Sequence, residues 1–146
     1  MMLAALTLAQ EAATHGEVPI GAVIVREGKI IASAHNLTEK NNDPTAHAEI
    51  LAIRSACEAL GSARLIDCDL YVTLEPCPMC ATAISFARIR RLYFGAYDAK
   101  GGGVEHGARI FSQPTCHHAP EVYGGIEENQ CATLLKKFFA ERRYSC

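Results

Sequence analysis

Two short motifs dominate this sequence: His47-Ala48-Glu49 and, thirty positions later, Pro76-Cys77-Pro78-Met79-Cys80. Cysteines at positions i and i+3 in the first turn of a helix lie side by side, so Cys77 and Cys80 can bind one ion. The helix N-terminus and the charge of a bound metal both favour the thiolate forms. With one imidazole added, a tetrahedral Zn²⁺ keeps its fourth position for water, which is typical of a catalytic site. We therefore predict one zinc ion per subunit, bound by His47, Cys77 and Cys80.

Glu49 lies two residues after the histidine and is the predicted acid and base of the site. Two thiolates offset part of the metal charge, so bound water is acidified less than by neutral ligands, and an adjacent base becomes useful. From the first turns of its helix, Glu49 can take a proton from the water, pass it to a ring nitrogen of a nucleobase and later protonate the departing ammonia. The two motifs together predict hydrolytic deamination by a zinc-activated water, and their combination is a general signature of nucleobase deaminases.

Periodicity along the chain predicts alternating helices and strands. Leu3, Leu6 and Ala13 recur near helical spacing, and Asp43-Pro44 offers an N-cap followed by proline at the first helical position. Glu27-Gly28 marks a tight hairpin turn between two β-branched runs. We expect helices over residues 2–15, 43–60, 78–87 and 127–143, and strands over 20–25, 29–34, 69–74 and 91–96. An irregular stretch follows the glycines at 101–103, and the whole predicts a mixed α/β sheet covered by helices.

The length and composition limit the class of protein. A chain of 146 residues, 49% of them hydrophobic, suits one soluble domain, which we expect to span residues 1–146. The formal net charge of −2 means that any nucleic-acid contact must come from a local basic patch. The seven cysteines do not form a disulfide pattern, and Cys57, Cys68 and Cys131 fall on apolar faces where we expect them to act as small hydrophobes. Without a signal peptide or a membrane-length apolar run, a reducing cytoplasm fits best.

Three longer stretches carry a family resemblance. They are Asp43-Pro44-Thr45-Ala46-His47-Ala48-Glu49-Ile50, Tyr71-Val72-Thr73-Leu74-Glu75-Pro76-Cys77-Pro78-Met79-Cys80 and Phe94-Gly95-Ala96-Tyr97-Asp98-Ala99-Lys100, with Asn36 before them. The chain closely resembles the bacterial tRNA-specific adenosine deaminases over nearly its whole length. The resemblance implies the three-layer α/β/α cytidine deaminase-like fold with a five-stranded mixed sheet. It also implies a homodimer that converts adenosine to inosine at the first, wobble, position of a tRNA anticodon.

The resemblance further implies which residues meet the substrate. Asn36 would hydrogen-bond the flipped nucleotide, and the backbone near Gly21 and Ala48 would line the base pocket. The anticodon loop would meet residues of two later segments, namely Asp98, Lys100, Phe138, Phe139, Arg142 and Arg143. From the residues alone, Asn36 is equally suited to a local turn. Phe138 lies on the apolar helix face, whereas Phe139 is angled about 100° away and is freer to stack on a base.

Other interpretations stay open at this point. The basic residues of the last helix, Lys136, Lys137, Arg142 and Arg143, also suit a solvated, dipole-matched helix end. The same zinc signature would serve a deaminase of free guanine or of a nucleotide such as dCMP. A catalytically silent zinc subunit that only binds RNA is a third possibility, although Glu49 argues against it. No role is predicted for Cys116, Cys146, His106, His117 or His118, and we expect the histidines to lie at the surface rather than form a second metal site.

Overall fold

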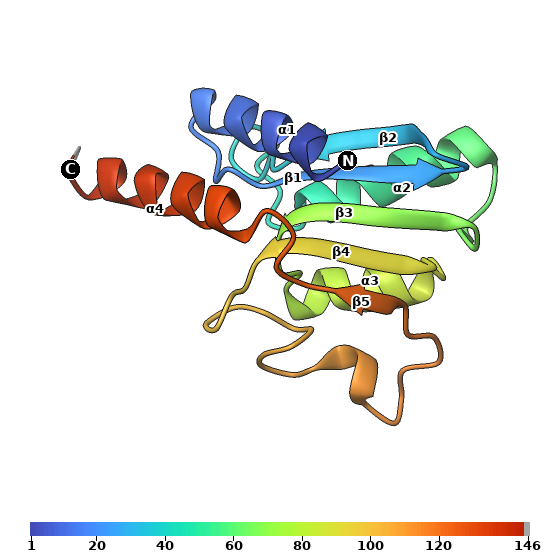
Figure 1. Cartoon of the computed structure of the whole chain (residues 1–146). Coiled ribbons are helices and arrows are strands. Elements are labelled where there is room, and N and C mark those ends of the chain that lie inside the picture. Colours follow the sequence, from blue (N-terminus) through green and yellow to red (C-terminus); the bar gives the residue numbers. More distant parts are fainter. Residues whose placement is uncertain (145–146) are drawn as a thin grey trace.

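The computed structural model describes residues 1–144, with side chains as far as Arg142. Five strands form one mixed sheet in the order β2-β1-β3-β4-β5 (Figure 1). Their bounds are Gly21–Arg26 for β1, Lys29–His35 for β2, Cys68–Leu74 for β3, Arg91–Ala96 for β4 and Glu121–Tyr123 for β5. Strand β1 runs antiparallel to β2 and β3, while β3, β4 and β5 are parallel to one another. The predicted five-stranded mixed sheet is confirmed.

Four α-helices cover the two faces of this sheet. Helices α1 (Met2–Thr14) and α4 (Glu128–Tyr144) lie on one face, and α2 (Ala48–Leu60) and α3 (Pro78–Phe86) lie on the other (Figure 1). A short 3₁₀ helix, Ile110–Ser112, belongs to the long segment between β4 and β5. The arrangement is the expected three-layer α/β/α fold. No helix in the described part of the chain is long and apolar enough to cross a membrane.

Alternating side chains along the strands divide the apolar interior into two clusters. On β3, Leu70 and Val72 join the cluster under α2 and α3, whereas Tyr71 packs against the cluster formed with α1 and α4. Because side chains alternate between the two faces of a strand, β3 contributes to both clusters, and its sequence is mostly apolar. Of the cysteines that we expected to be small hydrophobes, Cys68 and Cys131 are buried and Cys57 is half-buried against the first cluster.

Three tyrosines form a row across neighbouring strands on the α1/α4 face of the sheet. Tyr71, Tyr93 and Tyr123 occupy matching register positions on β3, β4 and β5. The rings of Tyr71 and Tyr93 are stacked with centroids 4.3 Å apart, and those of Tyr93 and Tyr123 with centroids 5.0 Å apart. Such cross-strand aromatic pairs stabilise a sheet beyond the burial of their area. The row links the short edge strand β5 to the centre of the sheet.

Two local predictions were wrong. The helix expected from Asp43-Pro44 begins only at Ala48, because the Asp43 carboxylate accepts hydrogen bonds from the N–H and the hydroxyl of Thr45 and so closes a turn. His47, in extended conformation, is the N-cap instead. In α1, Leu3 is 58% exposed, because it lies outside the buried face, which consists of Met2, Ala5, Leu6, Ala9 and Ala12.

Candidate metal centre and substrate cavity

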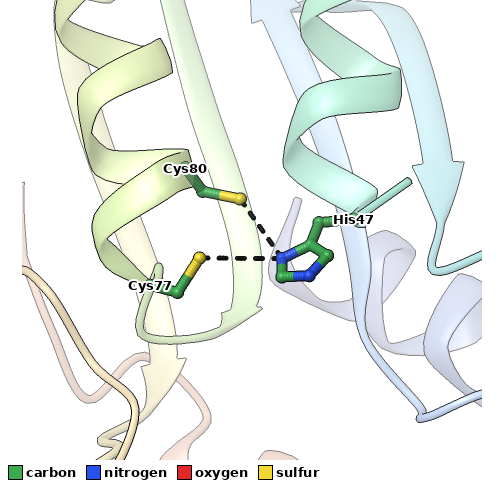
Figure 2. A group of neighbouring side chains, drawn as sticks. All are labelled: His47, Cys77 and Cys80. Carbon is green, nitrogen blue, oxygen red and sulfur yellow. Dashed lines mark hydrogen bonds between the residues drawn. The ribbon is translucent and has the colours of Figure 1, made fainter. Parts of the chain in front are cut away.

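The metal-binding candidates stand at the N-termini of two adjacent helices. Strand β3 ends at Leu74, and Glu75-Pro76 leads directly into α3, where Cys77 is the N-cap and Pro78 is the first helical residue. Cys80 therefore lies in the first turn of α3, while His47 caps α2. Figure 2 shows the imidazole and the two sulfurs pointing toward one another from these helices. The structure thus brings the side chains of two distant motifs together.

The spacing of these donor atoms fits a zinc ion. The Nδ1 atom of His47 lies 3.7 Å from the sulfur of Cys77 and 3.5 Å from that of Cys80, and all three ligand atoms lie within 4.8 Å of one another. A tetrahedral zinc ion with bonds of about 2.0 Å to nitrogen and about 2.3 Å to sulfur holds such atoms about 3.5 to 3.8 Å apart. One imidazole and two sulfurs are also the donor types that zinc prefers.

The electrostatics of the cluster favour a cation. A hydrogen bond from Cys80, with a further one from His47, lowers the pKa of Cys77 to about 4. The same bond to Cys77, together with burial, raises the pKa of Cys80, and the bond to Cys77 raises the pKa of His47. Cys77 therefore forms a thiolate readily, whereas Cys80 needs a positively charged partner to do so. A metal ion is the partner that suits both sulfurs at once.

Glu49 lies beside this cluster, in the first turn of α2. The residue is only 4% exposed, and desolvation raises the pKa of its carboxyl to about 7. A carboxyl with a pKa near neutrality can both hold and release a proton under ordinary conditions, which is the requirement for general acid and base catalysis. Its location and its protonation behaviour match the role predicted for it.

A cavity of about 320 Å³ opens over these residues. His47, Glu49 and Cys77 form part of its wall; the other lining residues are Val18, Ile20, Asn36, Thr38, Leu74, Glu75, Asp98 and Gly101. Asn36 is 5% exposed, and its Oδ1 is the one buried side-chain polar atom without a hydrogen-bond partner among the described residues. A buried acceptor without a partner is costly. Its position in the cavity wall therefore indicates a place for a hydrogen-bond donor of a ligand.

Comparison with known proteins identifies the family. Residues 1–96 match the family model described as the cytidine and deoxycytidylate deaminase zinc-binding region. The chain belongs to this deaminase family. It is 63% identical over 139 residues to the tRNA-specific adenosine deaminase of Agrobacterium fabrum, which covers 95% of this chain and 91% of that protein. The protein of the same name from Bacillus subtilis is 47% identical, with 97% and 88% covered.

Solved structures agree with this family assignment. One, from a study of A-to-I editing by tRNA:A34 deaminases at the wobble position of transfer RNA, is 63% identical and superposes with a TM-score of 0.91 over 92% of this chain and 97% of that one. The guanine deaminase of Bacillus subtilis is 37% identical, with a TM-score of 0.66 over 97% and 91%. The chain is thus a zinc-dependent hydrolytic deaminase with a cytidine deaminase-like fold.

A second, wider cavity of about 690 Å³ adjoins the first in this deaminase. The two share four lining residues, namely Val18, Leu74, Asp98 and Gly101. Three of the predicted substrate-binding residues, Asp98, Lys100 and Phe139, line the wider cavity, as do Tyr97 and Lys136. Phe139 is 48% exposed, whereas the neighbouring Phe138 is buried, as predicted from the helix angle. The structure therefore brings these residues to one continuous surface next to the metal cluster.

Other predicted substrate contacts of the deaminase lie elsewhere. Gly21 and Ala48 line neither cavity, and an added side chain at Gly21 would collide with the backbone of α1 at Ala5 and Ala9. The guanidinium of Arg142 donates to the carbonyl of Gly16 and lies 4.6 Å from the ring centre of Phe138. It therefore fastens α4 to the end of α1. The side chain of Arg143 lies outside the described residues.

Several residues of the deaminase site were not predicted from the sequence. Val18, Ile20 and Thr38 line the catalytic cavity from segments without a motif. Buried Glu75 accepts a hydrogen bond from His106, for which only a surface position was expected. Glu75 and His106 are 31 positions apart, and no spacing rule predicts their contact. The only sequence signal for a role of Glu75 was its position directly after an apolar strand.

The remaining histidines and cysteines do not build a second metal site in the described part of the deaminase. The one group of possible metal ligands found there is His47, Cys77 and Cys80. The thiol of Cys116 donates to the carbonyl of His118, and the imidazole of His118 bonds the carbonyl of Ile89. Cys146 lies outside the described residues. These contacts give Cys116 and His118 structural roles in the segment before β5.

Proposed function

We propose that this deaminase converts adenosine to inosine at the first, wobble, position of a tRNA anticodon. The observation that carries the proposal is the union of the two cavities. The catalytic cavity of about 320 Å³ suits one extruded base, and it opens into a wider surface bearing Tyr97, Phe139, Lys100 and Lys136. Aromatic rings and cations are the groups that bind flanking nucleotides of single-stranded RNA. A free base has no flanking nucleotides to fill that surface.

In the proposed reaction, His47, Cys77 and Cys80 hold one zinc ion per subunit. When bound, zinc lowers the pKa of water and so supplies the nucleophile for hydrolysis at neutral pH. Glu49 takes up one proton from the water and delivers it to N1 of the adenine. It then takes up the second proton, from the hydroxyl now bonded to C6, and passes it to the leaving amine, so that C6 becomes a carbonyl. Adenosine and water are thereby converted to inosine and ammonia. Glu49 is only 4% exposed and lies in the wall of the catalytic cavity.

Asn36 is the residue that we assign to orienting the flipped nucleotide. Its unpartnered Oδ1 can accept a hydrogen bond from a hydroxyl or amino group of the substrate. Asp98, Lys100 and Phe139 meet the anticodon loop in the wider cavity. Four further substrate contacts stay predictions, namely those of Gly21, Ala48, Arg142 and Arg143. Of these, a direct contact between Gly21 and the substrate is the least favourable, because Gly21 lies under α1.

We also propose that residues 1–146 act as one domain and work as a homodimer in the cytoplasm. Helix α3 leaves Phe86 75% exposed and Met79 36% exposed, and the two lie about two turns apart on the same helix face. An exposed apolar stripe of this kind supports a subunit interface. The free thiols, described from Cys57 to Cys131, support a reducing compartment.

The test is a substrate comparison with zinc-loaded protein. An anticodon stem-loop with adenosine at the wobble position is incubated beside free adenosine, cytidine, guanine and dCMP, and inosine and ammonia are measured. We expect inosine from the stem-loop alone. The Glu49→Gln variant serves as the control for contaminating deaminases.

A second candidate is deamination of a free purine. It is favoured by the 37% identity to the guanine deaminase of Bacillus subtilis, which uses the same fold. Ammonia from guanine, with no inosine from the stem-loop, would establish this alternative and reject the tRNA substrate.

A further inference from the structure

The buried carboxylate of Glu75, two residues before the predicted metal ligand Cys77, accepts hydrogen bonds on both of its oxygens from residues of its own chain. The side chain of Glu75 is 0% exposed. Its Oε2 accepts hydrogen bonds from the backbone N–H groups of Val104, Glu105 and His106, at 3.2, 2.9 and 3.1 Å. Its Oε1 accepts one from the N–H of Asp98 at 3.1 Å and one from Nδ1 of His106 at 2.8 Å. Every one of these donors belongs to the loop 98–106.

The same loop packs directly on the metal-binding turn. The N–H of Gly103 donates to the carbonyl of Pro76 at 2.8 Å. A side chain at Gly103 would come within 2.6 Å of the Pro78 nitrogen, and one at Gly102 would collide with the Glu75 carboxylate. The loop thus has no freedom to shift toward α3. Its distance from the metal ligands is set by this contact and by the Glu75 hydrogen bonds.

The other side of the loop faces the substrate cavities. Asp98 and Gly101 belong to the wall that the two cavities share. Tyr97, in the wall of the wider cavity, meets the ring of His106 edge-on with centroids 6.1 Å apart. His106 itself lines neither cavity. A change in the His106–Glu75 contact therefore reaches the substrate surface through the loop, through Tyr97 or through the part of the catalytic cavity wall that Glu75 forms.

We propose that Glu75 and His106 form a positioning pair that fixes the loop 98–106 against the substrate cavities and so governs substrate binding. The inference rests on the proposed function for the identity of the substrate. Glu75 lacks a free oxygen lone pair directed at solvent, and His106 supplies the one side-chain donor among its five. The burial of an ionisable carboxylate solely to bind one loop is costly, which indicates that the position of this loop matters.

The test uses His106, because Glu75 is too close to Cys77 for a clean variant. His106→Ala removes the side-chain donor, and His106→Asn returns an amide N–H near the position of Nδ1. His117→Ala is the matched control, since His117 is an exposed histidine of the same segment without a contact to Glu75 or to either cavity. Zinc content, kcat and KM on the stem-loop, and hydrogen exchange of the amides in 98–106 are measured for each.

We expect His106→Ala to bind zinc normally, to keep kcat within about twofold and to raise KM about tenfold, as for loss of a hydrogen bond to a charged group. The amides of Val104 and Glu105 should exchange about tenfold faster. His106→Asn should recover most of both effects, and His117→Ala should match the unmodified protein.

Two results would overturn the positioning role. One is an unchanged KM together with unchanged amide hydrogen exchange in His106→Ala, which would show that the His106–Glu75 contact does not fix the loop. The other is faster exchange with an unchanged KM, which would make the pair structural only. If the unmodified protein fails on the stem-loop, the proposed tRNA substrate is rejected; the KM comparison is then made with the free base or nucleoside that releases ammonia.

Discussion

At the scale of single residues, chemistry carried by short sequence motifs could be predicted. The histidine, the two cysteines and Glu49 were predicted because ligand type and i, i+3 spacing follow from the chemistry of zinc and the geometry of a helix. The partners of Glu75 were not found, because a buried carboxylate looks like any other acidic residue until the fold supplies its donors. From its sequence position, Asn36 suited a turn and a substrate contact equally well. Its unpartnered Oδ1 and its place in the cavity wall favour the substrate contact.

Glu49 provides the first prediction. Glu49→Gln removes the proton carrier but keeps the shape of the side chain, so we expect zinc content and stem-loop binding to be retained. Turnover should fall by about 10² to 10⁴, the usual loss for general acid and base catalysis. Single-turnover assays with zinc determined by metal analysis check this. A variant that turns over at near-normal rate would remove Glu49 from the mechanism.

Lys136 provides the second prediction. Lys136→Ala removes a cation from the wall of the wider cavity, so RNA affinity should fall and its dependence on salt should flatten by about 0.7 in the slope of log K against log salt. Binding of the stem-loop is titrated at several salt concentrations. Lys29→Ala, at the β1–β2 hairpin, is the matched control and should keep the full slope. Equal slopes in the two variants would place Lys136 outside the RNA interface.

At the scale of elements, long periodic segments were predictable and short or interrupted ones were not. Strand β4 was placed within its observed bounds, because a short apolar and aromatic run favours a strand. Strand β5 was not placed, since three residues show no alternation and their pairing with β4 is decided by the rest of the fold. Helix α2 began five residues after its predicted N-cap, Asp43, because the Asp43 side chain closes a turn of its own.

The junction of α1 with β1 provides the third prediction. Gly21→Ala places a methyl group against the backbone at Ala5 and Ala9, so α1 must move or the strand must bend. We expect a loss of about 1 to 3 kcal/mol in the free energy of unfolding, the usual cost of overpacking. Urea denaturation measures it, with Ser33→Ala on the exposed side of β2 as control. An unchanged midpoint would show that α1 is loosely attached.

At the scale of the whole molecule, the metal cluster ties two helices to the centre of the sheet. The ligands come from α2 and α3, and the strand that leads into α3 is the central one of five. The three-layer order could be predicted through the family resemblance, while the periodicity of the sequence alone predicted a mixed α/β sheet covered by helices. The wider cavity was beyond sequence reasoning, because its wall combines α4 with the segment after β4.

Loss of the metal provides the fourth prediction. Cys80→Ala should lose zinc and stability together, because binding free energy becomes folding free energy when ligands from two helices share one ion. We expect Tm to fall by about 5 °C or more, which corresponds to about 2 kcal/mol for a chain of this size. Calorimetry with metal analysis measures both. The unmodified protein treated with a chelator should fall to the same Tm; a zinc-free variant with full activity would refute the metal assignment.

The stacked row of Tyr71, Tyr93 and Tyr123 gives this protein an optical signal of its own. The chain has no tryptophan and only five tyrosines, so three of its five tyrosine chromophores are coupled across β3, β4 and β5. Near-ultraviolet circular dichroism, which depends on fixed side-chain packing, therefore reports chiefly on that half of the sheet. Unfolding confined to the edge strand would appear in this spectrum while the far-ultraviolet helix signal stayed nearly constant.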